Sequence, residues 1–418
     1  MKIIKNPAAE SWDSIFARPQ MDDSLIESRV CDIIDNVRRR GDRALRELTL
    51  RVEGIDLEEF EVSDEEIAAA CSAVSDELKG ALAVAKRNIE LFHRAQLTEG
   101  VDVETMTGVR CRQERRAIRR VGLYVPGGSA PLVSTVLMLA LPARIAGCKE
   151  LIICTPPNVA PEILYAAQLC GVDKVYRLGG AIAVAAMAYG TESVAKVDKI
   201  FGPGNRYVTT AKQLVSRDVA IDMPAGPSEV MIVADTTAQA RFVAADMLSQ
   251  LEHGGDSQAI AVVFSDDFAG ELVRTFGEQL RLLSRREIAE SAADNSRVIV
   301  VDDIDKALNI INYYAPEHLI LSVAEAENIV GRVESAGSIF LGNYSPESAG
   351  DYASGTNHTL PTNGWARSIS GVGVDSFTKK ITIQHITQEG LNLLAPAICA
   401  IADAEGLEAH KKAVTIRL

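Results

Sequence analysis

The first part of the chain carries its hydrophobic residues at helical spacing. Apolar side chains recur three and four positions apart in Leu25 to Val37 and again in Glu66 to Phe92, a pattern that predicts amphipathic helices. The positions between them are rich in charge, and we find no catalytic signature in this region. We therefore expect the residues up to roughly 115 to form a helical scaffold.

After Arg119 the pattern changes to short apolar runs that alternate with helical segments. The runs VGLYV, LIICT and KVYRL are typical of buried strands, and the segments between them end at Gly147 and Gly171, which favour helix ends. A second alternating stretch contains EVMIVAD, AIAVVFS, RVIVV, HLILS and SIFLG. Strands that alternate with helices predict parallel sheets, so the sequence indicates two α/β layers.

Two further segments stand outside these layers. Residues 343 to 373 are rich in Ser, Gly, Asn and Thr, and a structureless loop of that length in a compact domain is usually functional. Later, the strand-like run ITIQHIT is followed by a final helical segment, Pro396 to Lys412. This segment could pack on its own chain or on a partner.

Length and charge narrow the class of protein. The chain has 418 residues, 47% of them hydrophobic, which allows two or more domains with buried cores. Its net charge of -14 repels phosphate backbones and anionic lipids, so we expect neither nucleic acid nor membrane as a partner. The sequence begins without the pattern of a secretory signal, and the most apolar stretch, Leu132 to Ala143, is too short for a bilayer and predicts a buried helix.

The cysteines argue for a reducing compartment. There are seven, an odd number without a CxxC pair, which fits the cytoplasm better than a disulfide framework. Cys148, Cys154 and Cys170 lie in apolar contexts. An aldehyde-oxidising enzyme could use one as a nucleophile, but buried, unreactive thiols are commoner, and we favour that interpretation.

Three glycine clusters follow predicted strands. They are PGG at Pro126 to Gly128, GG at Gly179 and Gly180, and GPGN at Gly202 to Asn205. Such turns let the backbone approach a phosphate or a substrate at the carboxyl ends of parallel strands. None has the full GxGxxG spacing of a dinucleotide site, so tight turns and nucleotide contacts both remain open.

Several groups of polar residues could carry chemistry. Gln250 and His253 are three positions apart near a helix end, where they could share a metal or cap the helix. Glu317 and His318 lie side by side after Pro316 and just before a strand, where they could act as a carboxylate and a general base or lie on a surface loop.

The Ser- and Gly-rich segment adds Glu347, Asp351 and His358, a density of ligand-type groups that favours function over a mere connector. Glu405 and His410 are five positions apart, and on a straight helix they would point in different directions, as on a solvated face. The isolated His93 and His385 are expected to be structural. Together the available donors are oxygen and nitrogen atoms, which suit zinc at a catalytic site.

Six long segments, taken in order, resemble the histidinol dehydrogenases, and the resemblance runs nearly from end to end. They are RVGLYVPGGSAPLVSTVLMLALPARIAGC, KVDKIFGPGNRYVT, DMPAGPSEV, LSQLEHG, APEHL and ESAGDYASGTNHTLPT. The resemblance implies a zinc-dependent, NAD-linked oxidation of L-histidinol through L-histidinal to L-histidine, the last steps of histidine biosynthesis, in the cytoplasm.

The resemblance also implies a role for individual residues. His318 would be the general base and Glu317 would activate water. Zinc, one ion per subunit, would be held by Gln250, His253, Asp351 and, from the other subunit of a homodimer, His410. Substrate would contact these four ligands and His318, together with Ser228, His358 and, again across the dimer, Glu405. Tyr124 and Asn205 would contact NAD.

One position departs from the family pattern. Where the family motif usually reads GGAQA, this chain has Ile182 in the run Gly179 to Ala183. Isoleucine cannot form the side-chain hydrogen bond that the amide would give NAD, so we expect weaker cofactor binding and unaltered substrate binding.

The fold implied by the resemblance is α/β, with two incomplete Rossmann-like domains, small terminal segments and a C-terminal segment exchanged in the homodimer. Residues 1–118 and 228–372 would form a discontinuous domain that carries the metal and catalytic residues. Residues 119–227 would be inserted as the other domain, and residues 373–418 would reach the partner subunit. A related NAD-dependent dehydrogenase of another polar alcohol, a zinc hydrolase and a non-catalytic metal-binding protein are the alternatives.

Overall fold

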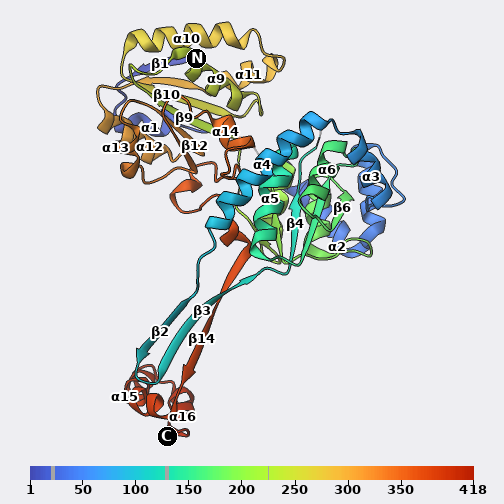
Figure 1. Cartoon of the computed structure of the whole chain (residues 1–418), viewed down its shortest axis with the longest axis vertical. Helices are drawn as coiled ribbons and strands as arrows, with labels where there is room; N and C mark the ends of the chain where they lie inside the picture. Colours follow the sequence, from blue (N-terminus) through green and yellow to red (C-terminus); the bar gives the residue numbers. More distant parts are fainter. Residues whose placement is uncertain (20–23, 128–130, 225) are drawn as a thin grey trace.

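The chain builds two α/β bodies and a long arm (Figure 1). The computed structural model describes residues 1–19, 24–127, 131–224 and 226–418. Gly128 of the PGG cluster and Ala225 of the DMPAGPSEV segment lie outside the described residues. Within the described ranges, no helix is both long and apolar enough to cross a membrane.

The first body is organised around a five-stranded parallel sheet. Its strands run in the order β6-β5-β4-β7-β8. Numbered along the chain this is the order 3-2-1-4-5, the first five positions of a doubly wound dinucleotide-binding sheet. The strands are β4 (Arg120–Tyr124), β5 (Glu150–Thr155), β6 (Lys174–Arg177), β7 (Lys199–Phe201) and β8 (Ala220–Ile221).

Helices cover both faces of this sheet because successive strand residues point to opposite sides. Val121 and Leu123 pack into the core that contains α5, whereas Ile152 and Cys154 pack into the core that contains α7. Helix α5 is buried along most of its length, which confirms the buried helix expected over residues 132–143. The helices that follow these strands are α5 (Val133–Ala146), α6 (Pro161–Leu169), α7 (Gly180–Tyr189) and α8 (Arg206–Val215).

The N-terminal helices also pack on the five-stranded sheet, which differs from the domain division expected from the sequence. They are α2 (Ser24–Glu53), α3 (Asp64–Ala73) and α4 (Asp76–Ala95). Apolar residues of α2 belong to the core around α7, those of α4 belong to the core around α5, and α3 packs partly buried residues against the core around α5. Their amphipathic pattern predicts a buried face but cannot say which sheet the face meets. The single helix expected over residues 66–92 is interrupted by extended backbone at Val74, after which Ser75 caps α4.

The second body is organised around a six-stranded parallel sheet. Its order is β1-β11-β10-β9-β12-β13, so β9 to β13 repeat the order 3-2-1-4-5 and β1 adds an edge strand. The strands are β1 (Lys2–Lys5), β9 (Glu229–Ala234), β10 (Gln258–Val263), β11 (Arg297–Val300), β12 (His318–Ser322) and β13 (Ser338–Leu341). The two parallel sheets confirm the α/β fold class.

Helices α9 to α11 cover one face of this sheet, and α12 with the short α1 covers the other. The helices are α1 (Trp12–Ile15), α9 (Ala240–Leu251), α10 (Asp266–Leu280), α11 (Arg286–Ala293), α12 (Ile304–Tyr314) and α13 (Ala326–Ile329), with 3-10 turns η1 (Ala9–Ser11) and η2 (Val330–Arg332).

The segment 343–373 is not structureless, as the sequence suggested. It contains helix α14 (Glu347–Tyr352) and the 3-10 turn η3 (Trp365–Arg367), and it is followed by η4 (Val374–Phe377). Pro346 stands at the N-cap of α14 with extended backbone, where its missing N–H costs no helical hydrogen bond. Helix α14 places Glu347 and Asp351 one turn apart on one face.

The arm is an antiparallel ribbon that carries the C-terminal helices away from both bodies (Figure 1). β3 (Val109–Ala117) lies between β2 (Val101–Met106) and β14 (Thr378–Ile386). At its tip, α15 (Gln388–Ala404) and α16 (Glu408–Thr415) replace the single final helix expected from the sequence. The chain turns between them at Gly406, whose φ of 70° is a backbone conformation that glycine adopts readily.

Candidate functional site

The candidate site lies between the two bodies, at the carboxyl edge of one sheet and the amino edge of the other. A pocket there is bounded by turns that follow β7 and β8 and by residues that precede β9 and β12. Its lining comprises Gly202, Pro203, Asp222, Met223, Gly226, Ser228, Glu317, His358, Thr359, Leu360 and Thr362. The expected substrate residues Ser228 and His358 thus meet Glu317 at one pocket.

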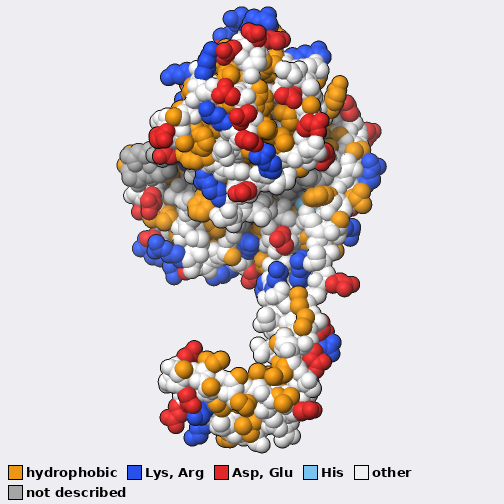
Figure 2. Space-filling model, turned by 90° about the vertical axis from the view of Figure 1, so that its left-hand side faces the viewer, with side chains coloured by type: hydrophobic (Ala, Val, Ile, Leu, Met, Phe, Trp, Pro, Cys, Tyr) orange, Lys and Arg blue, Asp and Glu red, His pale blue; other side chains and the backbone are white. Residues whose placement is uncertain are grey.

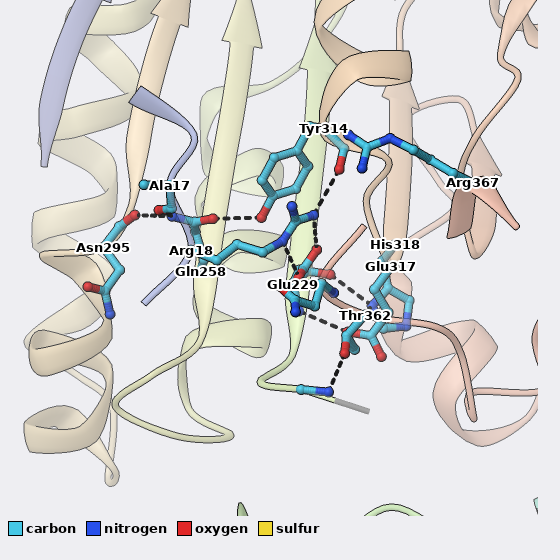
Figure 3. Close-up of polar contacts among 12 residues, drawn as sticks. Ala17, Arg18, Glu229, Gln258, Asn295, Tyr314, Glu317, His318, Thr362 and Arg367 are labelled. Carbon is cyan, nitrogen blue, oxygen red and sulfur yellow. Dashed lines mark hydrogen bonds and ion pairs between the residues drawn. The ribbon is translucent and has the colours of Figure 1, made fainter. Parts of the chain in front are cut away.

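Backbone bonds hold Glu317 and His318 at the amino end of β12 (Figure 3). The Glu229 N–H donates to Glu317 Oε2 at 2.8 Å, and His318 Nδ1 lies 3.2 Å from the Glu229 carbonyl oxygen. The turn into the pair uses Ala315 at a φ of 52°, followed by Pro316. The pair is therefore buried at a strand start and not on a surface loop, with both side chains fixed by one residue of β9.

Burial controls the protonation of this pair. It raises the pKa of Glu317 well above its ordinary value and lowers the pKa of His318 to about 3, so the His318 ring is neutral near pH 7. Because Nδ1 faces a carbonyl oxygen it must carry the ring hydrogen, which leaves the Nε2 lone pair free. Within the described part of the chain, buried Nε2 has no hydrogen-bond partner. A neutral imidazole with a free Nε2 can accept a proton from a substrate.

Helices α9 and α14 bring potential metal ligands together beside His318. One ligand atom each from His253, Glu347 and Asp351 lies within 4.8 Å of the others. With its amide nitrogen turned toward α14, Gln250 donates to Glu347, with 2.9 Å to Oε2. His318 Nε2 lies 3.8 Å from Asp351 Oδ1. The structure thus joins three of the four residues expected to hold a metal.

The electrostatics of this cluster favour a bound cation. Burial raises the pKa of Asp351 to about 7 and that of Glu347 well above its ordinary value, as expected for carboxyl groups gathered without a positive partner. The amide nitrogen of Gln250 points to Glu347, so its oxygen is the atom left to act as a ligand. Imidazole nitrogen with carboxylate and amide oxygens is a donor set that fits zinc.

His358 lines the pocket from the loop after α14. Its Nδ1 lies 2.9 Å from the Asp351 carbonyl oxygen, and its Nε2 lies 3.5 Å from Thr135 Oγ1 on α5. Burial lowers the pKa of His358 to about 4, so this ring is neutral near pH 7. His358 therefore links the metal-ligand helix to the first body.

The arm keeps Glu405 and His410 away from this cluster in the same chain (Figure 1). Both residues line a mostly apolar hollow at the tip, together with Ile398, Ile401, Ala402 and Leu407. The bend at Gly406 brings the two side chains to one hollow, which a straight helix would not do. A single chain thus lacks one expected metal ligand and one expected substrate contact at its own cluster.

The expected cofactor residues lie at the carboxyl edge of the five-stranded sheet. The Tyr124 hydroxyl accepts from the Gly180 N–H at 3.1 Å, and Asn205 Oδ1 caps α8 by accepting from Val208 N–H at 3.2 Å. A Cβ added at Gly180 would meet no atom within 4 Å, so there is open space at the start of α7. Glycine turns and helix starts on one parallel edge fit the phosphates of a dinucleotide.

Ile182 does not line this open space. Its side chain is 3% exposed and packs in the apolar core around α7 and α2. The cysteine interpretation also rests on burial, which raises the pKa of Cys148 to about 11, that of Cys170 to about 12, and that of Cys154 further. Such thiols are poor nucleophiles near pH 7.

Sequence patterns missed one residue that shapes the site, Glu229, and one contact of another residue, Glu347. Glu229 lies beside Ser228, and its carboxylate is bound by Arg18, which is 211 positions earlier in the chain. Glu347 stood among the polar residues of its segment, but its contact with Gln250 was not expected. Only recognition of α14 as a helix could have indicated the orientation of Glu347, because the spacing of Glu347 and Asp351 then places them on one face.

Comparisons with known proteins agree with the geometry. The family model described as histidinol dehydrogenase matches residues 16–418. A histidinol dehydrogenase of Bacteroides thetaiotaomicron is 55% identical over 100% of this chain and 99% of its own length, and one of Vibrio cholerae is 53% identical over 97% and 95%. The crystal structure of histidinol dehydrogenase from Elizabethkingia anophelis superposes with a TM-score of 0.98 at 49% identity, covering 100% of this chain and 98% of that one. The chain therefore belongs to the histidinol dehydrogenase family.

Proposed function

We propose that the chain oxidises L-histidinol through L-histidinal to L-histidine with two molecules of NAD. The observation that carries this proposal is the position of the buried pair Glu317 and His318. The pair lies beside the cluster of potential metal ligands and shares its pocket with the glycine turn that follows β7. An alcohol oxidation needs a base for the hydroxyl proton, and an aldehyde oxidation needs a water activator as well. The pair supplies one group of each kind.

The metal and the cofactor have separate places in this arrangement. Gln250, His253 and Asp351 would hold zinc, completed by His410 from a second copy of the chain, and Tyr124 and Asn205 would border NAD. When bound, zinc would orient the substrate through the imidazole and amine of histidinol, and NAD would accept the hydride of each oxidation.

The chain's own residues account for the proton movements. Neutral His318 takes the hydroxyl proton of histidinol through Nε2 while the carbon-bound hydrogen leaves as hydride, which yields the aldehyde. Glu317 then removes a proton from the water that adds to the aldehyde carbonyl. Protonated His318 returns its proton to the carbonyl oxygen, which completes the hydrate. His318, neutral again, takes one hydroxyl proton of the hydrate as the second hydride leaves. The product is the carboxylic acid, which loses its proton to solvent and becomes the carboxylate. Ser228 and His358 line the pocket that holds these intermediates.

A shared site explains the position of the arm. Its tip carries Glu405 and His410 away from the cluster, and hydrophobic side chains gather on its surface (Figure 2). Ile401, Leu393 and Ile416 are 60%, 50% and 75% exposed, an apolar surface that favours burial against a partner. We infer a homodimer in which each arm completes the other subunit's site. The seven free cysteines suit a reducing cytoplasm.

The division of labour between Glu317 and His318 gives the direct test. Histidinol added to enzyme, zinc and NAD should form two NADH per substrate, measured by absorbance. His318→Asn should slow both oxidations, whereas Glu317→Gln should chiefly slow the oxidation of added histidinal, since only that step consumes water. Equal losses on both substrates in both variants would overturn the assignment. No NADH from histidinol, together with NAD-independent hydrolysis of an ester or amide, would favour a hydrolase instead.

The metal has its own test. A chelator should abolish turnover and zinc should restore it, with the bound metal measured by competition against a chromogenic chelator. His253→Asn should lower zinc affinity by about tenfold or more, whereas His385→Asn, which changes an exposed histidine on β14, should leave it unchanged. Full activity in verified metal-free protein would overturn the zinc assignment.

The shared site is tested by mixing two inactive variants. His318→Asn and His410→Asn are unfolded together in equal amounts and refolded, so that half of the dimers contain one chain of each kind. One of the two sites in each mixed dimer then combines an intact His318 with an intact His410. Activity should recover to about a quarter of the unaltered enzyme. No recovery, with dimers confirmed by sedimentation, would exclude sharing of the site.

A further inference from the structure

Arg18, which is partly buried, forms a bidentate ion pair with the buried Glu229 at the start of β9 (Figure 3). Its Nε donates to Glu229 Oε1 at 2.6 Å and its Nη2 donates to Glu229 Oε2 at 2.8 Å. The Arg18 and Glu229 side chains are 18% and 3% exposed. A bidentate guanidinium–carboxylate pair fixes direction as well as distance, so the Glu229 carboxylate has one orientation.

The residue that Arg18 holds is the one whose backbone holds both catalytic side chains. The Glu229 N–H binds Glu317 and its carbonyl oxygen binds His318. The same carboxylate also accepts from the Asn363 N–H at 2.6 Å, in the loop that carries pocket residue Thr362. Movement of the Glu229 side chain would therefore be felt at the catalytic pair and at the pocket wall.

Arg18 also binds the segment that leads to the pair from the other side. Its Nη2 donates to the Tyr314 carbonyl oxygen at 2.8 Å, and its guanidinium lies 4.0 Å from the centroid of the Tyr314 ring. Tyr314 is the last residue of α12, and the chain then turns through Ala315 and Pro316 to reach Glu317. One guanidinium thus connects the start of β9 with the approach to β12.

We propose that Arg18 and Glu229 are positioning residues, which set the orientation of Glu317 through the backbone N–H of Glu229 and the ring tautomer of His318 through its carbonyl oxygen. This inference rests on the proposed function of that pair. If the ion pair is lost, the buried carboxylate or guanidinium must move toward water or find another partner. The Glu229 peptide then shifts, and His318 Nδ1 loses the carbonyl that keeps Nε2 unprotonated.

The test separates positioning from stabilisation. Arg18→Met and Glu229→Gln each leave one buried charge unpaired, so both should lower the melting temperature, and the double variant should recover much of that loss. If the pair positions the catalytic residues, kcat should fall about tenfold to a hundredfold in all three variants, because small displacements are costly in catalysis. The KM for histidinol should stay within about twofold. Recovery of both stability and kcat in the double variant would overturn the proposal.

Arg120 provides a matched control and Arg18→Lys a conservative variant. Arg120 also joins a carboxylate and a carbonyl, with 2.6 Å from Nε to Glu150 Oε2 and 3.0 Å from Nη1 to the Lys196 oxygen, but it lies at the amino end of β4, away from the pocket. Arg120→Met should leave kcat unchanged. Arg18→Lys keeps the positive charge but cannot bind the carboxylate through two parallel N–H groups. It should restore part of the kcat lost in Arg18→Met. A loss of kcat in Arg120→Met as large as that in Arg18→Met, or a kcat in Arg18→Lys no higher than that in Arg18→Met, would contradict positioning by Arg18.

A spectroscopic measurement makes the outcome independent of activity. The chain has six histidines, and ring nitrogen-15 spectra distinguish the tautomers of each, with His318 assigned from the signal missing in His318→Asn. His318 should be protonated at Nδ1 in the unaltered protein and should change tautomer in the Arg18→Met/Glu229→Gln double variant. An unchanged tautomer and unchanged kcat would overturn the positioning role. A changed tautomer with unchanged kcat would instead overturn the proposed role of His318 as base.

Discussion

The two parallel sheets share one strand order but meet the pocket with opposite edges. The turns after β7 and β8 face it from the five-stranded sheet, whereas Ser228, Glu317 and His318 precede or begin β9 and β12 of the six-stranded sheet. Ligands of such sheets usually bind at the carboxyl ends. Here that rule describes only the side expected to bind the cofactor, whereas the proposed catalytic pair, Glu317 and His318, lies at the amino end of a strand of the other sheet.

A buried ion pair supports each edge, and the two pairs act on different kinds of backbone. Lys212 and Asp222 bind the carbonyl oxygen and the N–H of Gly202, each at 2.8 Å, and so hold a glycine turn. Arg18 and Glu229 hold the start of β9, where the backbone N–H and carbonyl oxygen of Glu229 contact the side chains of the proposed catalytic pair. The comparison indicates that the carboxyl edge is built for close approach of a ligand, and the amino edge for fixed side chains.

The largest expected effect tests the amino edge. His318→Asn removes the group with the free Nε2, so kcat should fall by about 10² to 10⁴ on both histidinol and histidinal. The KM for NAD should change little because that residue lies on the opposite edge. Steady-state kinetics with each substrate checks this prediction. A rise in the KM for NAD with unchanged kcat would remove the distinction between the edges.

The next effect tests the carboxyl edge. Gly202 has a φ of 126°, and an added Cβ would overlap the Tyr124 carbonyl oxygen. Gly202→Ala should therefore cost about 2 to 4 kcal/mol of unfolding free energy, from backbone strain and overlap, and should raise the KM for NAD more than it lowers kcat. Chemical denaturation and kinetics measure both. The control is Gly331→Ala, where an added Cβ meets nothing within 4 Å and should change neither quantity.

A smaller effect concerns the departure from the family pattern at Ile182. Because this side chain is buried in the core, Ile182→Gln places an amide among apolar neighbours and should cost about 1 to 3 kcal/mol of stability. We expect no gain in NAD affinity by calorimetry, in contrast to the expectation from the sequence alone. Tighter binding of NAD by the Gln variant would show that α7 can turn this position toward the cofactor.

The smallest effect is a change in pH dependence at the contact between α4 and the site loop. Buried His93 lies 2.8 Å from the Ile89 carbonyl oxygen and 3.5 Å from Asn357 Nδ2, and burial lowers its pKa. The folded pKa is below the unfolded value of about 6.5, so its contribution is present above that pH and is lost as the pH falls through the folded pKa. His93→Gln should make the free energy of unfolding fall less steeply between about pH 7 and pH 5. The change in slope should correspond to at most one bound proton. Denaturation at several pH values tests this, with exposed His385→Gln as control, and an unchanged slope would contradict it.

The sequence predicted most elements but fewer of their partners. Apolar runs marked β4 to β6 and β9 to β13 but not β1, β7 or β8, and the expected helical scaffold did not include strands β2 and β3. The spacing of Gln250 and His253 indicated the end of a helix, although α9 ends at Leu251 and His253 follows it. Helix α14 was missed because its six residues include Gly350 and a serine and give too little periodic pattern. The contact of Arg18 with Glu229 joins residues 211 positions apart, and no local pattern contains it.

The same limit applies to the N-terminal helices and to the arm. An amphipathic stripe in α2 or α4 predicts burial, but which sheet buries it is decided by the three-dimensional path of the chain. Likewise, the run ITIQHIT predicts a strand, but its partner β3 lies some 260 residues earlier in the chain, so no local pattern indicates the pairing. The resemblance to a family, and not periodicity, supplied the roles proposed for Glu405 and His410.

The pairing of β3 with β14 also sets an order of events during synthesis. Thr378 of β14 pairs with Ala117 of β3, so the three-stranded ribbon cannot form until the chain has been extended by some 260 residues beyond β3. Until then β2 and β3 form a two-stranded hairpin, which is marginally stable alone. A polypeptide released before residue 378 would contain the strands of both parallel sheets but neither β14 nor the helices α15 and α16. If sites are shared as proposed, a site becomes complete only when its neighbour has been synthesised past His410.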